Sequence, residues 1–123
     1  MIKDYKDLIV WQKAMDLVVE VYALAKLLPK EEMYALSSQI RRAAISIPSN
    51  IAEGQARNST KEFTQFLAIA KGSKAELETQ LLLCIRIGYL NEGQIVTAIN
   101  TLAEIGKMIN ALQQKLTTPT PNH

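Results

Sequence analysis

The apolar residues of this chain recur at steps of three and four positions over four separate segments, which is the spacing of one face of an α-helix. The segments are long and the links between them are short, and short links place successive helices antiparallel. Only 5 Gly and 4 Pro occur among 123 residues, too few for a loop-rich β-sandwich. The sequence therefore predicts an all-α fold, an antiparallel up-down-up-down four-helix bundle.

Start and stop signals bound the predicted helices. Ser59 is followed three residues later by Glu62, which is the spacing of a capping box. Pro29 and Gly88 are stop signals for the first and third segments. We expect helices at about residues 8–28, 31–54, 59–88 and 92–116. The apolar stripe expected to face the core from the first helix consists of Leu8, Trp11, Met15, Val18, Val21, Leu24 and Leu28. Residues 1–116 then form one bundle domain, and residues 117–123 are predicted to be a disordered C-terminal tail.

Two residues are costly where they stand. Pro48 lies inside the second predicted helix, where proline costs about 3 kcal/mol, so this helix is expected to kink or restart. Gly72 lies inside the third, where glycine costs about 1 kcal/mol relative to alanine. One interpretation of Gly72 is a close approach by a neighbouring backbone.

Catalytic signals are largely missing from the sequence. The single His is His123, the last residue, which leaves no Ser-His or Cys-His dyad and no Glu-x-x-His metal motif inside the bundle. No glycine-rich phosphate loop occurs. Cys84 lies on an apolar stripe and is interpreted as a small buried hydrophobe. We expect no enzymatic activity, no cofactor, no metal site and no small-molecule substrate.

The beginning of the sequence has charges within its first apolar run, which is not the pattern of a signal peptide. The single Cys permits no internal disulfide, so a reducing compartment is the default. No apolar stretch is long enough to suggest a membrane span. These features predict a cytoplasmic protein that does not contact a membrane.

A polar stripe accompanies the apolar one on the second and third predicted helices. It is rich in short Ser, Gly and Asn side chains, which solubilise poorly but permit close contact. A solvated helix face is the plain alternative, since i,i+4 pairs on such a face are common. We favour a contact with another protein over a small-ligand site. The stripe consists of Ser38, Arg42, Ser49, Glu53 and Arg57 on the second helix and Glu62, Gln65, Gly72, Glu76 and Gln80 on the third, with Ser73 beside them.

Positive charge is concentrated in the middle of the chain. The net charge of the whole chain is +2, yet the segment from Ser38 to Lys74 has six bases and two acids, an excess of four positive charges. Such a segment could attract phosphate backbones, although ordinary surface charge explains it about as well. The six bases are Arg41, Arg42, Arg57, Lys61, Lys71 and Lys74.

The stretch SSQIRRAAISIPSNIAEGQARNSTKEFTQFLAIAKGSKAELETQL, residues 37–81, and the opening DLIVWQKAMDLVVEVY resemble a known family. They are similar to the four-helix-bundle proteins encoded within intervening sequences of bacterial 23S ribosomal RNA genes. The resemblance extends from about Tyr5 to Leu116. It implies a homo-oligomer, typically a pentamer, with no established enzymatic activity.

The family is related in fold to the accessory variability protein of diversity-generating retroelements, which is pentameric and engages nucleic acid. By that analogy, the six bases named above are candidates for contact with RNA or DNA. The resemblance also implies a set of residues for subunit or partner contacts. This set is Ser46, Ser49, Asn50, Glu53, Gly54, Ser73, Glu76 and Gln80.

Three hypotheses follow for the function. The first is an oligomeric bundle that binds nucleic acid, RNA in particular, through its basic segment. The second is a protein–protein assembly or adaptor module without nucleic-acid binding, for which replacing Ser49 and Ser73 with arginine should disrupt the complex and leave the helices intact. The third, a hydrolase with a metal between Glu53 and Glu76, is disfavoured because the acids are few and His is missing.

Overall fold

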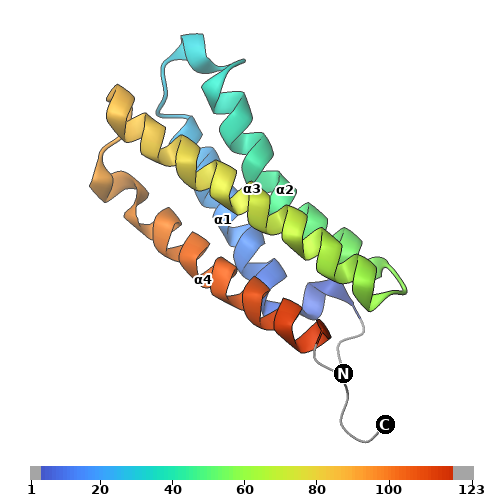
Figure 1. Ribbon diagram of the computed structural model, residues 1–123. Coiled ribbons are helices and arrows are strands. Elements are labelled where there is room, and N and C mark those ends of the chain that lie inside the picture. The colour runs from blue at the N-terminus through green and yellow to red at the C-terminus, as the bar shows by residue number, and fades with distance from the viewer. Residues whose placement is uncertain (1–3, 118–123) are drawn as a thin grey trace, which may run out of the picture.

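The computed structural model describes residues 4–117, and this part of the chain contains four long helices and no β-strand. The helices are α1 (Ile9–Ala25), α2 (Leu36–Ala56), α3 (Thr60–Ile87) and α4 (Glu92–Thr117). Short 3-10 turns, η1 (Tyr5–Asp7) and η2 (Lys30–Glu32), precede α1 and α2. The predicted all-α four-helix bundle is confirmed (Figure 1).

Each helix packs against two neighbours, in the circular order α1, α2, α3, α4. Neighbouring helices run in opposite directions, as their contacts show. Ser46 on α2 bonds to Ser73 on α3, whereas Gly54, further along α2, lies against Phe66, earlier on α3. On α1, Lys13 forms an ion pair with Glu104 of α4 at 2.8 Å. Two faces of the bundle, α1–α2 and α3–α4, therefore lie on opposite sides.

The core is a continuous cluster of aliphatic side chains drawn from all four helices. The stripes predicted for α2 and α4 face it largely as expected. The stripe predicted for the first segment is confirmed in part: Leu8, Val21, Leu24 and Leu28 are buried in the core, Trp11 and Val18 are half-buried at its edge, and Met15 is 43% exposed. The core also buries Val10, Ala14, Leu17 and Ala25 of α1, which lie outside the predicted stripe.

The predicted start of α2 near Glu31 is wrong by about one turn. After Pro29 the chain forms η2, and α2 begins only at Leu36. The Glu32 carboxylate explains the delay, since it accepts a hydrogen bond from the Leu36 amide at 3.3 Å. The same carboxylate accepts a hydrogen bond from the Tyr89 hydroxyl at 2.8 Å, which ties this turn to the link between α3 and α4.

The predicted N-cap of α3 is confirmed, because the Ser59 hydroxyl accepts a hydrogen bond from the Glu62 amide at 3.2 Å. The Glu62 side chain does not complete a capping box and pairs with Arg57 instead. The reciprocal pair occurs at the start of α4, where Asn91 and Gln94 each accept the other's backbone N–H at 2.9 Å. Gly88 ends α3 as predicted, in the left-handed conformation at φ 97°.

The helix α2 continues through Pro48 and does not restart there; the kink stays a prediction. The interpretation of Gly72 is wrong, because a Cβ at this exposed position would meet no atom within 4 Å. The close approach occurs at Gly54, where a Cβ would lie 2.6 Å from the Cβ of Phe66. Thr117 still belongs to α4, and the rest of the predicted tail, with His123, lies outside the described residues.

The half-buried carboxyl of Glu20 on α1 should make the stability of the fold depend on pH. Burial raises the pKa of its carboxyl, so the folded chain holds the proton more tightly than the unfolded chain. The folded state therefore loses stability as the pH rises through the folded pKa. We expect Glu20→Gln to raise the melting temperature at pH 7 and to change it little at pH 4. Asp16→Asn, on the exposed side of the same helix, is the control, and an equal gain in that variant would contradict the argument.

Candidate functional site

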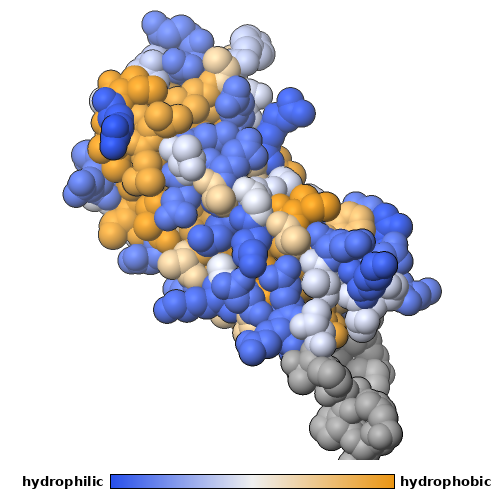
Figure 2. Space-filling view, viewed as in Figure 1, coloured by the Kyte–Doolittle hydropathy of each residue, from blue (hydrophilic) through white to orange (hydrophobic). Residues whose placement is uncertain are grey.

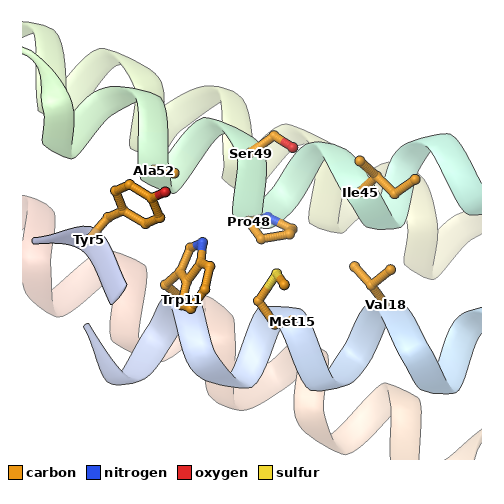
Figure 3. A pocket seen from close by; sticks show the side chains of 8 residues that line it. All are labelled: Tyr5, Trp11, Met15, Val18, Ile45, Pro48, Ser49 and Ala52. Carbon is orange, nitrogen blue, oxygen red and sulfur yellow. The ribbon is translucent and has the colours of Figure 1, made fainter. Parts of the chain in front are cut away.

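An apolar groove runs between α1 and α2 on one side of the bundle. Its cavity volume is about 350 Å³. Trp11 and Met15 of α1 point toward Pro48 of α2, and the Tyr5 ring closes one end by an edge-to-face contact with Trp11 at 5.4 Å between ring centres (Figure 3). This groove, called the α1–α2 groove below, is lined by Tyr5, Trp11, Met15, Val18, Ile45, Pro48, Ser49 and Ala52.

The sequence pattern missed this groove because it assigned Trp11, Met15 and Val18 to the core. A signal was present in the composition of α1, which has apolar residues on more of its circumference than one core-facing stripe needs. Val19, for example, is 73% exposed. On α2, Ile45 stands out of phase with the buried stripe and is itself exposed.

A second apolar surface covers the C-terminal end of α3 and the start of α4. Figure 2 shows the hydrophobic side chains gathered over this part of the bundle. Leu82, for example, is 49% exposed. This surface, called the α3–α4 patch below, consists of Leu82, Leu83, Ile87 and Val96. Because α1–α2 and α3–α4 are opposite faces, the groove and the patch point away from each other.

Between α2 and α3, a polar network joins the two helices. The hydroxyl oxygens of Ser46 and Ser73 lie 2.7 Å apart and share a hydrogen bond. The Asn50 side-chain amide donates to the Ser46 carbonyl at 2.8 Å and to the Ser46 hydroxyl at 2.9 Å. Two serine hydroxyls carry two protons and their shared bond uses one. The other proton has no acceptor among residues 4–117.

Above this network lies a polar pocket of about 310 Å³, lined by Gln39, Arg42, Ala43, Ser46 and Glu76. Within the described part of the chain, Arg42 makes no hydrogen bond or ion pair. Glu76 receives one long hydrogen bond of 3.4 Å from the side-chain amide of Gln80. The Gln80 carbonyl oxygen is buried and has no partner. We call this site the α2–α3 pocket.

The structure divides the predicted contact residues into two groups. Ser46, Asn50 and Ser73 bond to one another, Gly54 is buried against α3, and Gln80 is buried beside Glu76. These five residues make their contacts within the subunit, and Ser46, Ser73 and Gly54 join α2 to α3. The exposed group is Ser49 in the α1–α2 groove, Glu53 beside Arg57, and Glu76 in the α2–α3 pocket.

Four of the six predicted cations make contacts within the subunit. Arg57 pairs with Glu53 at 2.7 Å and lies over the Phe66 ring. Arg41 lies over the Tyr22 ring of α1 and donates to the Met33 carbonyl at 3.3 Å. Both arginines are thus engaged within the subunit.

The lysines of α3 point mostly toward α4. Lys71 donates to Asn110 at 2.8 Å and to Gln113 at 3.2 Å. Lys74 pairs with Glu78 and lies against Gly106. Of the six predicted cations, Arg42 and Lys61 are the two whose side chains make no hydrogen bond or ion pair within residues 4–117.

The described residues hold no cluster of three or more His, Cys, Asp or Glu side chains that could bind a metal. Glu76 of α3 lies beside Ala43 of α2, and Ala43 is ten residues from Glu53 on that helix. At the rise of an α-helix this separates the two carboxylates by roughly 15 Å, too far for one metal ion. Cys84 is buried and burial raises the pKa of its thiol, which disfavours the reactive thiolate. Across residues 4–117, none of the helices is both long and apolar enough to cross a membrane.

The comparisons with known proteins agree with this bundle. Residues 6–111 match the model of the family described as 23S rRNA-intervening sequence protein. A solved structure from Bacteroides thetaiotaomicron, a protein of unknown function from the S23 ribosomal protein family, is 31% identical and superposes with a TM-score of 0.79, covering 86% of this chain and 96% of that one. Among curated proteins, none matches this chain. The chain therefore belongs to the family of 23S rRNA-intervening sequence proteins.

Proposed function

We propose that this chain is a non-enzymatic assembly protein that forms a ring of identical copies. In this ring, the α3–α4 patch of one copy packs into the α1–α2 groove of the next. The observation that carries the proposal is the pair of apolar surfaces on opposite sides of one subunit. Contiguous exposed apolar surface on a small protein marks an interaction site.

The position of the two surfaces favours a head-to-tail contact. A two-fold dimer joins the same patch on both subunits, and it would leave the opposite surface uncovered. A head-to-tail contact uses both surfaces on every copy, and it closes into a ring when the rotation between neighbours permits. The family resemblance implies five copies, so we expect a particle of about five times the 13.7 kDa subunit mass.

The test is the mass in solution together with a mixing experiment. We expect Met15→Glu, in the groove, and Leu82→Glu, in the patch, each to yield monomers when alone. Mixed in equal amounts, they should form a dimer, because one variant keeps an intact patch and the other an intact groove. Ala111→Glu, at an exposed position of α4 outside both surfaces, is the control and should keep the full assembly.

Light scattering at micromolar concentration measures each mass. A monomeric wild-type chain would overturn the proposal as a whole. An assembly whose two variants fail to pair when mixed would overturn the head-to-tail arrangement. Helix content by circular dichroism should be unchanged in all three variants, since the three positions are exposed.

Binding of RNA or DNA has less support from the geometry than assembly has. Four of the six predicted cations are engaged within the subunit, and Arg42 and Lys61 lie about 19 positions apart on different helices. A ring would repeat these two charges around its axis, so nucleic-acid binding stays a prediction. This prediction requires that RNA or DNA binds the protein at low salt and that the affinity falls steeply as salt is added. The absence of binding at low salt would reject the prediction.

A further inference from the structure

The α2–α3 pocket carries two opposite charges that do not neutralise each other. Arg42 and Glu76 line the same pocket, one from each helix, and they form no ion pair. Two other pairs of opposite charges on the same helices do form ion pairs, Arg57 with Glu53 and Lys74 with Glu78. A guanidinium and a carboxylate held apart on facing walls leave room for a ligand between them.

Gln80 lies beside the α2–α3 pocket, next to Glu76, and is not one of the residues that line it. Its residue is only 5% exposed, yet its carbonyl oxygen has no hydrogen-bond partner. Turning the amide over would aim that oxygen at the Glu76 carboxylate, so the observed orientation is the one that the charge requires. A buried acceptor without a partner is a cost to the fold, and such costs concentrate at functional sites. In the orientation that leaves this oxygen unpaired, the Gln80 amide group donates to the Glu76 carboxylate at 3.4 Å.

The floor of the pocket offers a further donor. Ser46 lines the pocket and shares its hydroxyl bond with Ser73, and one proton of this pair is left over. Asn50 donates to the Ser46 hydroxyl oxygen at 2.9 Å, and the spare proton belongs to either Ser46 or Ser73. The pocket thus presents a cation, an anion and the hydroxyl group of Ser46 within about 310 Å³.

We infer that the α2–α3 pocket binds a free α-amino acid, with its carboxylate on Arg42 and its ammonium group on Glu76. A simple anion, such as phosphate, would be repelled by Glu76, and a simple cation would be repelled by Arg42. A zwitterion satisfies both charges at once, and an arginine binds a carboxylate by two parallel hydrogen bonds. The site is separate from both apolar surfaces, so the inference does not depend on ring assembly.

Calorimetric titration of the full chain tests the inference, with L-alanine, L-glutamine and L-arginine as probes. Each probe is compared with its N-acetyl derivative, which lacks the ammonium group, and with its carboxamide, which lacks the carboxylate. We expect at least one amino acid to bind and both of its derivatives to bind about tenfold more weakly or worse, because each has lost a charge-assisted contact. Failure of all three amino acids to bind, or equal binding of the derivatives, would overturn the inference.

Variants then assign the contacts. We expect Arg42→Gln and Glu76→Gln each to weaken the amino acid about tenfold or more, whereas Arg86→Gln, an exposed arginine further along α3, should not. Gln80→Leu separates a positioning role from a structural one. It should weaken binding while the melting temperature stays equal or rises, because the unpaired carbonyl is gone. The site would be rejected if Arg42→Gln and Glu76→Gln bind the amino acid as well as wild type, or if Arg86→Gln loses as much affinity as they do. The role of Gln80 would be rejected if Gln80→Leu binds the amino acid as well as wild type.

Discussion

Replacing Ser73 with arginine is expected to cost the bundle about 3 kcal/mol or more of its free energy of unfolding. Ser73 is only 8% exposed, and its hydroxyl lies 2.7 Å from that of Ser46 across the α2–α3 contact. A guanidinium there would be a nearly buried charge without a partner, and it would replace the hydroxyl that bonds to Ser46 across the two helices. The result to expect is loss of cooperative unfolding or separation of α2 from α3.

Ser49→Arg is the matched substitution, three residues further along α2 than Ser46. Ser49 is exposed at the rim of the α1–α2 groove, so an arginine can extend into solvent. We expect its melting temperature to stay within a few degrees of wild type, while assembly is weakened. Urea unfolding followed by circular dichroism measures both variants. A Ser73→Arg chain as stable as Ser49→Arg would show that Ser73 does not hold α2 against α3.

This contrast changes how the assembly hypothesis must be tested. From the sequence, Ser49 and Ser73 belong to one polar stripe, and replacing both was expected to disrupt a complex without harming the helices. The structure places one serine on a free surface and the other inside the subunit. A double variant would therefore lose its assembly through unfolding, and single variants at exposed positions are needed instead.

The helices could be predicted from the sequence because their signals are local. The apolar spacing of α2, the Ser59 cap and the Gly88 stop act within a few residues, and each is present in the structure. The start of α2 could not be placed, since it depends on the Glu32 carboxylate, which also bonds to Tyr89 from a distant part of the chain.

The candidate sites could be predicted only in part, because they depend on which helices become neighbours. A stripe of short polar side chains has the same sequence pattern whether it faces an adjacent helix or a partner, and here Ser46 and Ser73 face an adjacent helix. The basic segment shows the same limit. Its positive charges can be counted from the sequence, but Lys71 is engaged by Asn110 and Gln113, about forty residues further on. No local pattern announces such a pairing.

Gly54→Ala and Gly72→Ala are expected to change stability in opposite directions. At Gly54 the new methyl group would lie 2.6 Å from the Cβ of Phe66 and 3.0 Å from the Cδ1 of Phe63. The contact with Phe66 cannot be relieved by a side-chain rotation, because the Phe66 Cβ is attached directly to the α3 backbone. The helices must separate, and overpacking of this kind costs about 1–3 kcal/mol. At Gly72 the methyl group meets nothing within 4 Å.

Gly72→Ala should therefore stabilise the chain by about 0.5–1 kcal/mol, through the better helix propensity of alanine and its smaller loss of backbone entropy. Urea denaturation measures both variants, and all samples must be compared at one protein concentration because assembly adds to apparent stability. The Gly54 variant should also lose affinity at the α2–α3 pocket, since separating the helices moves Arg42 away from Glu76. Destabilisation by both substitutions, or by neither, would mean that the approach of α2 to α3 is not set at Gly54.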